Sequence, residues 1–168
     1  KAAIQAAKEA AFPAADYDVA AAGTNWSSTL TTTNGTWLNQ GGVNFTPEKA
    51  FDGLTGSNNA AIPADNGEPI TWKVPSGVSA VAATVTVLAT SITVNGSSVA
   101  SNLSADKQEV SIGNLSTGDV VVITRDGIAP NLFAIALAGD ILVDSGFGAN
   151  GFYLPFNPAA TGVNYSSF

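Results

Sequence analysis

The sequence contains no cysteine, no histidine and no methionine. Without cysteine there is no disulfide framework and no thiolate metal site, and the chain gives no clue to its redox compartment. Without histidine and cysteine, Ser-His-Asp and Cys-His nucleophile systems are excluded, and so are zinc sites built from nitrogen and sulfur ligands. These absences remove most classes of hydrolase.

Charged residues are also scarce, at 11% of the chain, and the six lysines and arginines are scattered among thirteen aspartates and glutamates. Phosphate binding needs clustered basic side chains, so a net charge of −7 argues against nucleic acid or an anionic membrane as the partner. The longest apolar stretch, 132–143, is interrupted at Gly139-Asp140 and is too short to span a bilayer. We expect neither a nucleic-acid partner nor a membrane partner.

What the chain does contain favours strands and turns, because Ala, Val, Thr, Ser, Asn and Gly dominate its 168 residues. This length suffices for one β-sandwich with terminal appendages. No secretory signal opens the sequence. The first residue is Lys1 and not an initiator Met, so we expect the chain to be part of a longer protein. We predict a helix over 1–13, a β-sandwich domain over 14–146 and an ordered linker over 147–168 that leads toward a further module.

The first segment, "KAAIQAAKEAAF", consists of strong helix formers and stops at Pro13. A helix this short is marginal in water, so it either docks on the domain or ends a coiled coil that begins upstream. After Gly146, repeated glycines and prolines break any period, which is typical of an extended exit segment.

Between these ends, β-rich runs alternate with turn residues, at 70–74, 83–89, 91–94, 108–112 and 119–124. Asn95-Gly96 lies between two alternating runs and predicts a hairpin with a type I′ turn, and Ala138-Gly139-Asp140 predicts a second hairpin. In the run before that second turn, Phe133, Ile135 and Leu137 are expected on one face of a central strand, with alanines on the other. The pattern predicts an all-β antiparallel sandwich.

Carboxylates and aromatic rings are the remaining candidates for chemistry. Two carboxylates could flank a glycosidic bond, but most aspartates sit singly in turns, and no phosphate-cradling glycine motif occurs. We therefore expect a protein that is not an enzyme and has no resident cofactor. A structural calcium ion near Asp65 and Glu68 stays open, because "ADNGE" clusters oxygen ligands within a few residues.

The tryptophans divide into two groups by their surroundings. Trp72 alternates in phase with Ile70 and Val74, which predicts core packing. Trp26 and Trp37 stand among Ser, Thr, Asn and Gly, and are the better candidates for exposed platforms that stack on sugar rings.

Three segments carry a resemblance when taken together in order: "NWSSTLTTTNGTW…PEKAFDGLTGSNNA" (25–60), "ITWKVPSGV…VTVLATSITVNGSSV" (70–99), and "LFAIALAGDILVDSGF" followed by "GFYLPFNPAATG" (132–162). They resemble a domain of tail fibres and other virion appendage proteins of marine phages, particularly phages of cyanobacteria. The "AFDG" corner is also similar to the turn of discoidin-like, galactose-binding-like jelly rolls.

The resemblance implies a jelly-roll-like sandwich in which Phe51 packs beneath the corner, Asp52 accepts backbone hydrogen bonds and Gly53 takes a backbone conformation suited to glycine. It also implies a homotrimer that contacts other virion proteins. The expected aromatic anchors of the exit segment, on the domain or on a neighbouring subunit, are Phe152, Tyr153 and Phe156.

The function expected from this resemblance is a non-enzymatic structural domain in a phage tail fibre, which links a stem to a distal host-recognition part. Two alternatives stay open. The same sandwich could decorate a capsid, or it could be a carbohydrate-binding module for a host surface glycan, with Trp26 or Trp37 as the platform.

Overall fold

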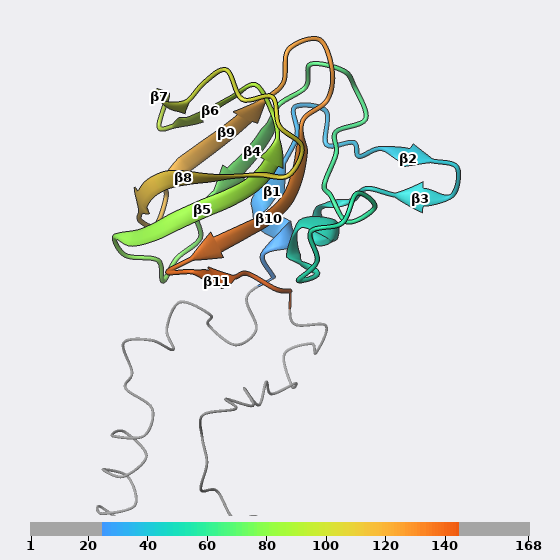
Figure 1. Ribbon diagram of the computed structural model, residues 1–168. Coiled ribbons are helices and arrows are strands. Elements are labelled where there is room, and N and C mark those ends of the chain that lie inside the picture. The colour runs from blue at the N-terminus through green and yellow to red at the C-terminus, as the bar shows by residue number, and fades with distance from the viewer. Residues whose placement is uncertain (1–24, 145–168) are drawn as a thin grey trace, which may run out of the picture.

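A computed structural model describes residues 25–144, which form two facing β-sheets and a small side hairpin (Figure 1). The predicted helix over 1–13 and the predicted linker over 147–168 lie outside the described residues. Within 25–144, no helix is long and apolar enough to cross a membrane.

The strands form three antiparallel sheets. The five-stranded sheet has the order β1 (Leu30–Thr31), β4 (Ile70–Lys73), β9 (Val120–Thr124), β6 (Ser91–Val94) and β7 (Ser97–Ala100). The four-stranded sheet has the order β11 (Asp140–Ile141), β10 (Asn131–Leu137), β5 (Val81–Leu88) and β8 (Gln108–Leu115). β2 (Asn39–Gln40) pairs with β3 (Val43–Asn44), and two short 3-10 helices, η2 (Ser27–Thr29) and η3 (Pro47–Phe51), precede β1 and β4.

The core lies between the two large sheets, and its residues come from alternating positions along the strands. Ile70 and Trp72 point inward from β4, and Val85 and Val87 point inward from β5, each with 1% or less of its surface exposed. Alternate side chains of a strand lie on opposite faces, so the period-two pattern of the sequence places one apolar row from each strand in this layer. The predicted all-β antiparallel sandwich is confirmed.

Both predicted hairpins are present. Asn95 and Gly96 join β6 to β7 with φ values of 51° and 78°, the positive values that a type I′ turn requires at both central residues. Ala138 and Gly139 join β10 to β11 with φ values of 52° and 90°. Alanine in this conformation is uncommon, and the pairing of Leu137 with Asp140 holds it there.

The face assignment predicted for β10 is wrong at one residue. The pairing of β10 with β5 shifts between Leu132 and Ala134, so Phe133 is the additional residue of a β-bulge. Leu132, Ile135 and Leu137 pack in the main core, whereas Phe133 packs in a second cluster. A bulge reverses the alternation on one side of it, which a strict period-two pattern does not anticipate.

That second cluster brings the hairpin β2–β3 and its flanks against the four-stranded sheet. Its buried members are Ala60, Ile62, Ala129 and Phe133. Three partly buried residues pack against them: Leu38, Phe45 and Leu88. Backbone hydrogen bonds in both directions between Ala61 and Leu132, at 2.8 and 3.0 Å, attach this segment to β10. The sequence pattern did not predict β2 and β3, which have only two residues each.

Candidate functional site

The corner at Phe51, Asp52 and Gly53 follows η3 and is a structural turn. Phe51 ends η3 and is 1% exposed in the main core. The Asp52 carboxylate accepts a hydrogen bond from the Leu54 N–H at 2.8 Å, and Gly53 has a φ of +77°. The local geometry of the three residues is the expected one: a buried aromatic ring, a carboxylate that accepts a backbone hydrogen bond and a left-handed backbone position.

The same corner contacts the last described residue, Asp144. Its N–H donates to the Phe51 carbonyl at 2.8 Å. Its carboxylate accepts from the Trp26 N–H at 2.5 Å and from the Ser27 N–H at 3.2 Å to each oxygen. One aspartate therefore joins the start of the described chain to its end, which the sequence pattern did not reveal.

The three tryptophans have different environments. Trp72 is fully buried, as predicted, and its indole nitrogen is buried without a hydrogen-bond partner. The expectation of an exposed Trp26 is wrong: it is 4% exposed and belongs to the main core, so its ring offers no platform for a sugar. Trp37 is half-buried, packs against the main core and forms an isolated bridge with Pro63.

Trp26 is buried because the turn of η2 and the Asp144 contact fix its backbone beside the sandwich. The polar neighbours that suggested exposure are used locally. The Asn25 side chain accepts from the Ser27 hydroxyl at 2.6 Å, and the Trp26 carbonyl accepts from the Thr29 hydroxyl at 2.6 Å.

The two carboxylates proposed for calcium do come together, around Asn34. The Asn34 N–H donates to Glu68 Oε1 at 2.6 Å, and its side-chain amide donates to Asp65 Oδ2 at 2.9 Å. Glu68 is 6% exposed, and its Oε2 is buried without a partner. Calcium takes six to eight oxygen ligands, whereas residues 25–144 contain no group of three or more His, Cys, Asp or Glu able to hold a metal ion. The calcium site stays a prediction.

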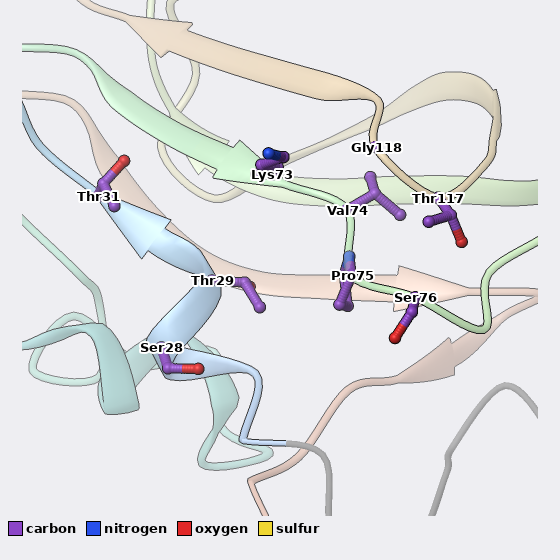
Figure 2. Close-up of a pocket in the computed structure, with 9 residues that line it drawn as sticks. All are labelled: Ser28, Thr29, Thr31, Lys73, Val74, Pro75, Ser76, Thr117 and Gly118. Carbon is purple, nitrogen blue, oxygen red and sulfur yellow. The ribbon is translucent and has the colours of Figure 1, made fainter.

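A pocket of about 580 Å³ opens beside β1 and the end of β4 (Figure 2). Ser28 and Thr29 of η2 and Thr31 of β1 line one side. The other sides are formed by the end of β4 with the loop after it and by the turn between β8 and β9: Lys73, Val74, Pro75, Ser76, Thr117 and Gly118. Sequence reasoning missed this pocket, since its hydroxyls come from three separate segments.

The local sequence explains how these segments meet. The Gly118 N–H donates to the Val74 carbonyl and the Val74 N–H donates to the Asp119 carbonyl, both at 2.9 Å. These bonds extend the β4–β9 pairing past Lys73 and hold the two loops side by side. Lys73 follows the inward-facing Trp72, so its side chain belongs to the outer face of the sheet.

Phe152, Tyr153 and Phe156, the predicted anchors of the exit segment, lie outside the described residues. No protein-family model matches the chain, and no curated protein matches it with a significant score. The resemblance of the three sequence segments to phage appendage proteins therefore stays a prediction.

Proposed function

We propose that this chain is a non-enzymatic structural domain of a virion appendage, with a phage tail fibre as the leading placement. The proposal rests on the resemblance of segments 25–60, 70–99 and 132–162, and on residue chemistry that lacks the usual nucleophile systems. It locates the protein on the virion, as a homotrimer in contact with other virion proteins.

The placement of the two ends of the described chain supports a refinement of this role. Trp26 and Ser27 are hydrogen-bonded to Asp144, so the chain enters and leaves the sandwich at one end (Figure 1). The ends of a domain often lie close together, and adjacent ends suit a domain inserted into a longer chain. The sandwich then projects from the side of a fibre, and the flanking segments connect stem to tip.

Immunogold labelling of intact particles tests this placement. Antibody raised to the purified chain would be applied to particles of a phage that carries the gene and read by electron microscopy. We expect gold on the tail. Gold on the head would move the role to capsid decoration, and unlabelled particles alongside a positive control for the antibody would contradict a virion role.

The carbohydrate-binding alternative now depends on residues other than Trp26. Trp37 is half-buried against the core, so at most part of its ring is available for stacking. If Trp37 were the platform, Trp37→Ala would abolish saturable binding to a host glycan set. Unchanged binding would exclude it as the platform.

A further inference from the structure

The pocket beside Lys73 has a chemistry that none of the structural roles above uses. Lys73 is the single charged residue among those that line it, and the remaining lining consists of hydroxyl-bearing, small or apolar residues. In the part of the chain that the structure describes, the ion pair recorded joins Lys107 to Asp106 at 3.9 Å. The Lys73 ammonium therefore has no carboxylate partner among residues 25–144.

The acidic residue that directly follows Gly118 of the pocket, Asp119, already has hydrogen-bond partners. Its carboxylate accepts from the Asn95 side chain at 2.9 Å and from the Ser116 N–H at 2.7 Å. One bond joins the carboxylate to the β6–β7 turn, and the other joins it to the turn between β8 and β9. The positive charge of Lys73 is left to a group from outside the domain.

The hydroxyls of the pocket are oriented by bonds to the backbone. Ser28 Oγ donates to the Asn25 carbonyl at 2.7 Å, Thr29 Oγ1 to the Trp26 carbonyl at 2.6 Å, and Thr117 Oγ1 to the Val78 carbonyl at 2.9 Å. A hydroxyl has one proton and two lone pairs, so each of these oxygens can still accept a hydrogen bond. The matching ligand is rich in hydroxyl donors.

Phosphate groups fit this lining poorly. A polyphosphate needs several donors at once, from clustered Arg and Lys or from a row of backbone N–H groups. Here one ammonium stands among oriented acceptors, and the Gly118 N–H is already bonded to Val74. A ligand that matches this lining needs one anionic group for the ammonium and several hydroxyl groups for the acceptors. A sugar that carries a carboxylate or a sulfate has both.

The surface beside the pocket, on the outer face of the five-stranded sheet, also consists largely of short hydroxyl-bearing side chains. Thr31 pairs with Thr71, Thr71 with Val122, Val122 with Thr93, and Thr93 with Ser98, which makes one row across all five strands. Neighbouring strands are about 4.8 Å apart, so the row is a strip of short side chains that starts at the pocket and follows the twist of the sheet. A chain of sugar residues has room to lie along it.

We propose that the Lys73 pocket is a binding site for an acidic saccharide, in which Lys73 pairs with the carboxylate or sulfate and the hydroxyls of Ser28, Thr29 and Thr117 accept hydrogen bonds from the sugar. This property belongs to the domain itself and does not depend on the virion placement. An open pocket of this kind binds weakly, and several copies in one oligomer raise the overall strength.

The test is an NMR titration of the ¹⁵N-labelled full chain with three probes: oligogalacturonate for the carboxylate, a carrageenan oligosaccharide for the sulfate, and maltohexaose as the neutral counterpart. We expect saturable shifts for residues 28–31, 73–76 and 117–118 with one or both acidic probes, and binding to the neutral probe at least about tenfold weaker, the value of one charge-assisted contact. The response to the two acidic probes distinguishes carboxylate from sulfate.

Two variants sharpen the result. Lys73→Gln should weaken binding of the acidic probe by about tenfold, whereas Lys107→Gln, the same change of charge at a site already paired with Asp106, should leave it unchanged. Both lysines are exposed, so both variants should stay folded, with a small loss of stability in Lys107→Gln because the Lys107 ammonium lies 5.9 Å from the centroid of the Phe133 ring. Equal binding of neutral and acidic probes, parent-like binding by Lys73→Gln, or no shift at the pocket with either acidic probe overturns the proposal.

Discussion

At the scale of single residues, Gly53 is needed for its backbone conformation and not because a side chain would lack room. A Cβ added at Gly53 would meet nothing nearer than Val143 Cγ2 at 3.6 Å, which is ordinary contact. The φ of +77° is nevertheless unfavourable for a residue with a side chain, by about 1–2 kcal/mol. Substitution should therefore act through the backbone and not through a clash.

We predict that Gly53→Val lowers the free energy of unfolding by about 1–2 kcal/mol or more, since a β-branched residue tolerates positive φ least. The matched control is Gly56→Val, at a glycine with no positive φ and nothing within 4 Å of an added Cβ. It should change stability by less than about 0.5 kcal/mol. Urea unfolding followed by tryptophan fluorescence measures both, and equal effects would contradict the backbone explanation.

Asp144 is a second residue whose role is specific, because both of its carboxylate oxygens accept backbone N–H groups. In Asp144→Asn, one acceptor becomes an NH₂ group that faces those donors. We predict a loss of about 1–3 kcal/mol in unfolding free energy, the range for a charge-assisted bond left unmade. Asp140→Asn removes the same charge from exposed β11 and should be near neutral. Equal unfolding midpoints for the two variants would show that the Asp144 contacts contribute little.

At the scale of elements, Asp119 connects two turns. It accepts from Asn95 of the β6–β7 hairpin and from Ser116 of the turn between β8 and β9, and these bonds, the Asn95 bond first, lower the pKa of the Asp119 carboxyl below its ordinary value. A carboxyl with a lowered pKa in the folded state stabilises that state above its unfolded pKa. The contribution is lost as the pH falls through the folded pKa.

This predicts a loss of stability below about pH 4, the ordinary range for aspartate, that depends in part on Asp119. The pH dependence of the thermal midpoint should be shallower in Asp119→Asn than in the parent chain. Asp126→Asn, in the exposed turn after β9, is the control and should keep the parent slope. If Asp119→Asn keeps the parent slope as well, the link between the two turns does not act through this carboxylate.

At the scale of the whole molecule, the two ends of the described chain are held side by side by the bonds of Asp144 to Trp26 and Ser27. All described strands and the main core lie between them. A unit with its own core and adjacent ends should fold without its flanks.

We predict that a chain of residues 25–144 alone unfolds cooperatively, with a urea midpoint close to that of the full chain. Inserted into a surface loop of an unrelated monomeric host protein, it should fold without unfolding the host, because its ends span a short gap. A truncated chain that fails to unfold cooperatively, while the full chain does so, would show that the flanking residues complete the fold.

Local patterns were sufficient for much of the fold. The alternation around Trp72 predicted its burial, and Asn95-Gly96 predicted its hairpin, because side-chain period and positive φ are properties of a few adjacent residues. The corner residues Phe51, Asp52 and Gly53 were predicted by resemblance and have the expected local geometry.

Features that depend on residues far apart in the sequence could not be predicted from local patterns. Trp26 packs in the core between distant segments, and its backbone is bound by Asp144, 118 positions away in the sequence. The placement of Phe133 depends on a bulge whose position is set by pairing with β5, and the pocket beside Lys73 exists only where η2, the end of β4 and the turn after β8 meet. The sequence by itself determined strands, turns and the inward rows, since these follow from neighbours along the chain. The tertiary structure alone decided that Trp26 is buried despite its polar neighbours in sequence, and which hydroxyls share a pocket. Hydrogen bonds and packing between remote segments carry no local signal.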